Sequence, residues 1–277
     1  MFYRKYGYFR YDYHPECTEA TCLSIISFNS LYYSILRSES EDEILNQQLA
    51  WLQSNLANAE KNRKFIIFMH IYPGQYQVFD ETYFWDDEST AKFVKIIEMY
   101  PDRIMMMLGA HTHYGDIRIN LPTSNSKGGF WNTNEEPVAK YSMLATPSYS
   151  LSNYNNPGFT TFKVRNNSAR DIKFTFMEAH KFPQDAEEAT YNELDFTSEL
   201  GLDEWSHENA QKAISKLENS WIGFFRYLGH KIGFHGFLNI YGFFTHYLLG
   251  SVGFFTKTIF LCSSRHVNKE DFHNCIN

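Results

Sequence analysis

The sequence lacks the clusters of Lys and Arg with which proteins bind nucleic acid. Its 277 residues carry 25 basic and 32 acidic side chains, so the formal net charge is −7. Because phosphate backbones are bound by clustered positive charge, this balance excludes nucleic acid as a main partner. The mean hydropathy of −0.43 is too low for a polytopic membrane protein. A hydrophobic fraction of 43% still provides for a folded core, which excludes a disordered chain.

Cysteine is scarce, and neither close pair has the Cys-x-x-Cys spacing of metal or redox sites. The pairs are Cys17 with Cys22, and Cys262 with Cys275. Local pairs are typical of an exported protein with disulfides, whereas four reduced thiols would be typical of an intracellular one. The first residues do not resemble a signal peptide, because charges are scattered among them and no apolar stretch follows. A single sequon makes Asn166 a candidate glycosylation site.

Charged side chains are absent from residues 232–256, a stretch long enough to cross a membrane. Its apolar side chains fall on one helical stripe, while His235, Asn239 and His246 fall on another, and the stretch contains five glycines. This pattern favours an amphipathic helix, or two short ones, that packs against protein or lies on a lipid surface. A membrane span is the alternative.

Apolar runs of strand length alternate with helical patterns along the first part of the chain. The pattern predicts a helix from Glu41, with Leu45, Leu49, Leu52 and Leu56 on one face, and a second helix over 89–100 capped by Ser89 or Thr90. It also predicts strands over 22–29, 65–69, 104–108 and 141–145, and a hairpin of 159–164 with 172–176. This alternation predicts an α/β fold whose site lies at the carboxyl ends of the strands.

Three histidines follow two of these predicted strands. His70 comes directly after the run 65–69, and His111 and His113 follow the run 104–108. We expect His111 and His113 to point to the same side, because residues two apart do so in an extended chain. Neutral imidazole is a common ligand of zinc, iron and manganese, so the three residues are candidate metal ligands. The alternative is three solvated polar residues at strand ends.

Around these histidines the sequence resembles a known family. Phe65–Gly74 (FIIFMHIYPG) resembles the strand–His–Ile–Pro–Pro–Gly segment of the acid sphingomyelinase-like phosphodiesterases, which belong to the calcineurin-like metallophosphoesterase superfamily. Leu108–His113 (LGAHTH) resembles their Gly-His-Thr-His motif. The helical segment 48–52 (QLAWL) resembles their Gln-Leu-x-Trp-Leu helix, and Leu144–Phe159 (LATPSYSLSNYNNPGF) resembles their Ala-Pro-Ser and Asn-Pro-Gly stretch.

The resemblance implies a fold, a metal centre and a compartment. It implies a partial metallophosphoesterase β-sandwich flanked by helices over residues 1–178, followed by an aromatic-rich helical subdomain over 179–277. Two zinc ions act on a phospholipid or nucleotide phosphodiester in the family. His70 and His111 resemble ligands of one zinc ion, and His113 resembles a ligand of the other. The family is secreted or lysosomal, and the spacing of Cys262 and Cys275 resembles one of its disulfides.

The resemblance covers only the C-terminal part of the family, and Ala110 stands where the family has Gly. The Asp-x-His, Gly-Asp and Gly-Asn-His motifs are missing from their proper setting. Asp12-Tyr13-His14 has the letters of the first motif but follows no apolar strand. We therefore expect at most one weak zinc site, no catalytic residue and no hydrolysis by this chain alone. The alternative is an inactive truncated relative that acts as a binding or structural protein.

An incomplete family core has consequences for partners. Sheet edges and one side of the core should be exposed. Either a second polypeptide covers this open core, or the sequence given begins after the true start. The expected partners are therefore a phosphodiester substrate, if an upstream half completes the site, and a membrane surface contacted by residues 232–256.

Overall fold

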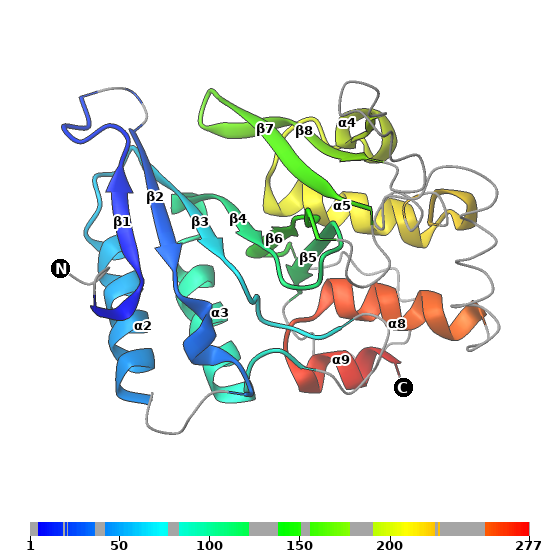
Figure 1. Ribbon diagram of the computed structural model, residues 1–277, viewed down its shortest axis with the longest axis horizontal. Coiled ribbons are helices and arrows are strands. Elements are labelled where there is room, and N and C mark those ends of the chain that lie inside the picture. Colours follow the sequence, from blue (N-terminus) through cyan, green and yellow to red (C-terminus); the bar gives the residue numbers. More distant parts are fainter. Residues whose placement is uncertain are drawn as a thin grey trace.

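The chain folds as a mixed α/β structure, which confirms the predicted fold class (Figure 1). The computed structural model describes residues 5–18, 20, 22–36, 42–76, 83–121, 138–150, 156–177, 191–224, 227 and 253–276. The strands are β1 (Phe9–Asp12), β2 (Cys22–Phe28), β3 (Arg63–Met69), β4 (Ile104–Gly109), β5 (Asp116–Asn120), β6 (Tyr141–Ala145), β7 (Gly158–Arg165), β8 (Ser168–Met177) and β9 (Tyr191–Asp195). The α-helices are α2 (Asp42–Ala57), α3 (Asp87–Met99), α4 (Phe196–Leu200), α5 (His207–Glu218), α8 (Gly253–Arg265) and α9 (Lys269–Ile276), with 3-10 turns at Ser30–Tyr33 and Pro101–Arg103.

A six-stranded sheet in the order β1-β2-β3-β4-β6-β5 forms the centre of the fold. Neighbouring strands among β2, β3, β4 and β6 pair in parallel, while β1 and β5 pair antiparallel at the two edges. The four apolar runs predicted as strands correspond to the four parallel strands. Their carboxyl ends lie along one edge of the sheet.

Both faces of this sheet carry apolar side chains, which explains why the central strands are nearly continuous apolar runs. Phe65 and Ile67 of β3 belong to a core cluster shared with α2 and α3. Ile66 of the same strand and Leu108 of β4 belong to a second cluster, shared with β8, α5 and α8. Figure 1 shows α2 and α3 side by side along β1 to β3, and α5 and α8 beside β5 and β6. Alternate residues of each strand therefore stabilise two separate layers.

A second sheet, in the order β7-β8-β9, contains the predicted hairpin. Its turn is formed by Asn166 and Asn167, whose φ angles of 48° and 68° are left-handed values that Asn tolerates. Asn166 is exposed at the hairpin tip, and its glycosylation stays a prediction. β9 pairs with β8 from beyond residue 178. The division into domains at that residue also stays a prediction.

Helix α3 begins earlier than the sequence pattern predicts. The predicted caps Ser89 and Thr90 lie inside the helix, and the N-cap is Asp86. The Asp86 carboxylate accepts a hydrogen bond from the backbone N–H of Ser89 at 2.8 Å. Aspartate is among the strongest N-cap residues because its oxygen satisfies an otherwise unpaired N–H group. The predicted cap was therefore wrong by three or four residues.

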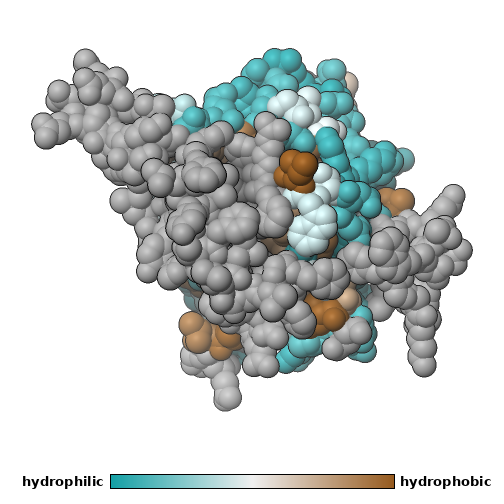
Figure 2. Space-filling model, turned by 90° about the vertical axis from the view of Figure 1, so that its right-hand side faces the viewer, coloured by the Kyte–Doolittle hydropathy of each residue, from teal (hydrophilic) through white to brown (hydrophobic). Residues whose placement is uncertain are grey.

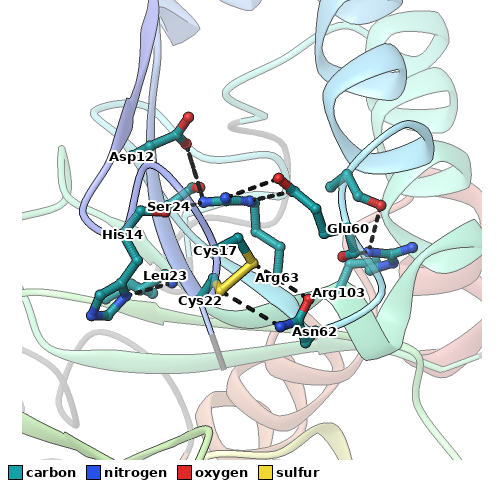
Figure 3. Close-up of a disulfide and its surroundings, with 11 residues drawn as sticks. Asp12, His14, Cys17, Cys22, Leu23, Ser24, Glu60, Asn62, Arg63 and Arg103 are labelled. Carbon is teal, nitrogen blue, oxygen red and sulfur yellow. Dashed lines mark hydrogen bonds and ion pairs between the residues drawn. A yellow bond between two sulfur atoms is a disulfide. The ribbon is translucent and has the colours of Figure 1, made fainter. Parts of the chain in front are cut away.

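The two local cysteine pairs form disulfides, Cys17–Cys22 and Cys262–Cys275. The first closes the connection between β1 and β2, and the second joins α8 to α9 (Figure 3 shows the first). Asn62 lies against the first, with its Oδ1 atom 3.4 Å from Cys17 Sγ and its Nδ2 atom 3.6 Å from Cys22 Sγ. Two disulfides are typical of a protein that folds in an oxidising, extracellular-type environment.

One face of β1 to β3 is only partly covered by the described residues. Tyr11 of β1 is 56% exposed and Phe68 of β3 is 40% exposed, on the face opposite α2 and α3. Within the described ranges, no helix is both long and apolar enough to cross a membrane. Residues 232–252 of the uncharged stretch lie outside the described residues. In Figure 2, described residues on the right-hand face of Figure 1 are mainly hydrophilic, with separate hydrophobic spots.

The partly buried His207 at the start of α5 predicts a pH dependence of stability. Burial is the main influence on this residue and lowers its pKa below the ordinary value of 6.5. The unfolded chain therefore binds the proton more tightly, so stability present above pH 6.5 is lost as the pH falls through the folded pKa. In urea unfolding, we expect His207→Gln to lose less stability than the unmodified protein when the pH falls from about 7.5 to about 5.5. These two values lie roughly one unit on either side of the reference histidine pKa. Equal losses would show that His207 does not contribute.

Candidate functional site

Two neighbouring parallel strands bring the candidate histidines to one edge of the central sheet. His70 directly follows β3, and His111 and His113 follow β4. The strands pair in parallel, with Phe68 opposite Leu108, so their carboxyl ends lie together. The backbone N–H of Ala110 then donates to the carbonyl of His70 at 2.9 Å, which continues the pairing past the strands. The structure therefore places the three histidines at the edge of the sheet where the parallel strands end, which is the location that the sequence predicts.

His70 and His111 form a close pair. Their ring centroids are 5.3 Å apart, and the rings meet edge to face at 78°. The edge of Phe84 also contacts the His111 ring, with centroids 5.2 Å apart. His113 lines the same pocket as the other two. The fold therefore brings all three predicted residues to one pocket, with two of the rings in contact.

The backbone conformation that achieves this differs from the prediction. His111 and His113 have φ angles of 70° and 66°, so this segment is left-handed at both residues rather than extended. The prediction of an extended chain at His111 and His113 was therefore wrong, although both residues line the same pocket. Non-glycine residues seldom adopt this region, because their Cβ atoms crowd the backbone. Such conformations persist only where the surrounding structure holds them.

The electrostatics of the pair favour neutral imidazole, which is the form that binds a metal. Desolvation is the main cause that lowers the pKa of His70, and the charge of His113 adds to it. Desolvation likewise lowers the pKa of His111, with His70 and His113 adding to it. At neutral pH the unprotonated nitrogen atoms are therefore available as ligands.

The pocket around the histidines has a volume of about 450 Å³ and a mixed lining. Aromatic side chains line it from β3, from the segment after β6 and from β7: Phe68, Tyr149, Phe159 and Phe162. The rings of Tyr149 and Phe159 are stacked at 5.8 Å. No acidic side chain is found among the described lining residues. The pocket therefore combines imidazole nitrogens with apolar walls.

The spacing of the pair fits two ligands of one zinc ion. With Zn–N bonds of about 2.0 Å and tetrahedral geometry, two imidazole centroids bound to one ion lie about 5 Å apart. The 5.3 Å between the His70 and His111 rings matches this separation. Over the described ranges, no group of three or more His, Cys, Asp or Glu side chains is arranged to hold a metal ion. The described residues therefore supply two neighbouring imidazoles and not a complete set of metal ligands.

The Asp12-Tyr13-His14 segment lies at the opposite edge of the sheet. Asp12 pairs with Ser24 near the start of β2, whereas His70 follows the end of β3. Arg63 forms an ion pair with Asp12 at 3.5 Å, and His14 Nδ1 accepts a hydrogen bond from the N–H of Leu23 (Figure 3). Asp12 ends β1, so the segment does follow a strand, and none of the described residues that line the pocket comes from it.

Tyr72 and Thr112 are neighbours of the pair that the sequence argument did not single out. The Tyr72 hydroxyl donates to Thr112 Oγ1 at 3.2 Å. Thr112 is the residue between His111 and His113 in the sequence. A signal was present in the sequence. Tyr72 is a hydroxyl-bearing residue only two positions after His70.

Comparison with known proteins gives structural neighbours alone. No protein-family model matches the chain, and no curated protein matches it in sequence. Among solved structures it is similar to PhoD, with 9% identity and a TM-score of 0.42 over 67% of this chain and 40% of PhoD. It is also similar to GAP50, described as the anchor in the inner membrane complex of Plasmodium, with 11% identity and a TM-score of 0.37 over 76% of this chain and 60% of GAP50. The chain thus spans less than two thirds of either structure.

Proposed function

We propose that this chain binds one zinc ion through His70 and His111 and presents it to a phosphodiester in the adjoining pocket. The contact of the two imidazole rings at 5.3 Å, at the shared edge of β3 and β4, carries the proposal. The motif resemblance around both histidines supports it. When bound, zinc supplies a Lewis acid that orients and polarises a phosphate oxygen.

The chain's own residues have separate roles in this proposal. His70 and His111 hold the ion as neutral ligands, because desolvation disfavours their protonation. His113 lines the same pocket and is the candidate ligand of a second ion. Phe68, Phe159 and Phe162 form apolar walls that suit either the acyl chains of a phospholipid or the base of a nucleotide. We propose a secreted or lysosomal location on the same resemblance and the two disulfides.

Binding rather than hydrolysis is the activity that we propose for this chain by itself. A dinuclear site needs a carboxylate to bridge its ions, and the described lining of the pocket has none. Hydrolysis is the second candidate. It requires a carboxylate from outside the described residues, contributed by more of the same polypeptide or by a second one covering the exposed face of β1 to β3.

Zinc content measures the proposal directly. After equilibrium dialysis, elemental analysis of the 277-residue protein should find about one zinc ion per chain, since two to three imidazoles hold one ion at most. His70→Ala and His111→Ala should each remove it, because a single remaining ring of the pair binds weakly. His14→Ala is the matched control, since His14 lies at the opposite sheet edge and should leave zinc binding unchanged.

Two results would contradict the proposal. One is zinc retention in both His70→Ala and His111→Ala, which would place the ion elsewhere. The other is rapid zinc-dependent cleavage of a simple aryl phosphodiester by the purified chain, which would show a complete catalytic site. No turnover above buffer is the expected result for this substrate.

A further inference from the structure

The loop between β4 and β5 holds two histidines in a conformation that needs external support. His111 and His113 are both left-handed, and Thr112 lies between them with 5% of its surface exposed. The N–H of Thr112 donates to the carbonyl of Ala110 at 2.8 Å, which tightens the turn. The direction of both imidazoles therefore depends on how firmly this short loop is held.

Tyr72 lies directly behind this loop. It is fully buried, and its hydroxyl donates to Thr112 Oγ1 at 3.2 Å. Its ring packs so closely beneath the end of β4 that a Cβ atom at Gly109 would lie 2.7 Å from its Cδ1 atom. The edge of Phe84 fixes the same ring, with centroids 5.3 Å apart. Tyr72 is therefore immobilised in contact with the strand that leads into the loop.

Arg118 holds Tyr72 from the other side. Its guanidinium lies 5.3 Å from the centroid of the Tyr72 ring, and its Nη2 atom donates to the Tyr72 hydroxyl oxygen at 3.5 Å. Arg118 is itself fixed by Asp116 at 2.6 Å and by the carbonyl of Ser263 in α8 at 2.9 Å. Because the hydroxyl oxygen accepts from Arg118, its proton is directed to Thr112.

We propose that Tyr72 is the positioning residue of the histidine site, with Arg118 as its support. Its hydroxyl fixes Thr112 and so orients His111 and His113 toward the pocket before an ion binds. The inference rests on the proposed function, because His111, one of the two residues that it orients, is a proposed zinc ligand. A core-packing role would depend on the Tyr72 ring alone, whereas this role depends on the hydroxyl.

The test removes single hydroxyl groups and keeps the surrounding volume. Tyr72→Phe and Thr112→Val each delete one partner of the bond, and Thr112→Ser keeps the hydroxyl. Tyr33→Phe is the matched control, because this buried tyrosine loses a comparable hydrogen bond, to the carbonyl of Leu45 at 3.1 Å. Tyr33 belongs to the core cluster shared with α2 and α3, away from the loop.

The first measurement is amide hydrogen exchange in the metal-free protein. The quantity compared is the ratio of the exchange rate at residues 110–113 to the exchange rate in β4. This ratio should be about tenfold higher in Tyr72→Phe and Thr112→Val than in the unmodified protein. Thr112→Ser and Tyr33→Phe should leave this ratio unchanged. Unchanged exchange in Tyr72→Phe would overturn the proposal, whether or not the protein binds zinc.

The second measurement is zinc affinity by competition with a chelator. Each hydroxyl deletion should weaken binding about tenfold, as is typical when a group behind a metal ligand is removed. The double variant should be no weaker than either single variant, because both lose the same bond. Normal affinity in both single variants, with zinc lost in His70→Ala, would refute positioning and leave the zinc site standing. Absence of zinc binding by the unmodified protein would refute the proposed function instead.

Discussion

Replacing Asp116 by alanine is expected to lower the free energy of unfolding by about 3–5 kcal/mol. Asp116 and Arg118 form an ion pair at 2.6 Å in which both side chains are 1% exposed. Removing the carboxylate leaves the guanidinium buried without its counter-charge, which is the costly outcome for such a pair. The Tyr227 hydroxyl also loses its acceptor, since it donates to Asp116 Oδ1 at 3.3 Å. Chemical denaturation followed by circular dichroism measures the change.

Two further variants distinguish the buried charge from other causes. Asp116→Ala combined with Arg118→Met should be less destabilised than the sum of the single changes, because no charge then remains buried. Glu208→Ala is the matched control, since the Glu208–Lys212 pair is exposed and solvent screens its attraction, so little loss of stability is expected. A loss below about 1 kcal/mol for Asp116→Ala would show that the guanidinium is solvated or otherwise satisfied.

Gly115→Ala is expected to destabilise the protein by about 3 kcal/mol through overpacking. A Cβ atom at this position would overlap the ring of Phe174, which is 1% exposed. That ring packs edge to face against Phe196, with centroids 4.6 Å apart, so it has little freedom to move. The methyl group must therefore displace the loop before β5 from β8, and thermal unfolding should show a lowered midpoint.

A second substitution should reverse part of this loss. Gly115→Ala with Phe174→Leu should be more stable than the sum of the two single changes predicts, because leucine vacates the space that the new methyl group takes. Gly223→Ala is the matched control. Among the described residues, its added Cβ would meet the Ser220 side chain alone, at 3.1 Å from Oγ, so a much smaller loss is expected. Strict additivity of the Gly115 and Phe174 changes would exclude the proposed overlap.

Local chemistry made much of the fold predictable. The strands β4 and β6 were recognisable because burial on both faces makes them nearly continuous apolar runs. The strands β2 and β3 were recognisable because the side chains on their covered face are mainly apolar. Helix α2 was recognisable because Leu45, Leu49, Leu52 and Leu56 form one buried stripe. The cap of α3 was missed because Asp86, Ser89 and Thr90 are all acceptable capping residues, and the final choice depends on where the chain turns from the sheet.

The candidate site was predictable in position but not in conformation. That His70, His111 and His113 follow adjacent strands could be seen in the chain itself, and parallel pairing then placed them at one edge. The left-handed angles of His111 and His113 could not be seen, because Thr112 between them bonds to Tyr72, a contact across 40 residues of sequence. Tyr72 in turn depends on Arg118, which lies 46 residues away in the sequence.

The sequence by itself determined the features that depend on neighbouring residues. These are the apolar strands, the leucine face of α2, the two-asparagine turn at Asn166 and the disulfides within two short segments. Only the tertiary structure decided the strand order, the 5.3 Å contact of His70 with His111, and the buried chain of polar contacts from Asp116 to Thr112. The physical reason is that such contacts form only when packing brings distant segments together and removes water from between them.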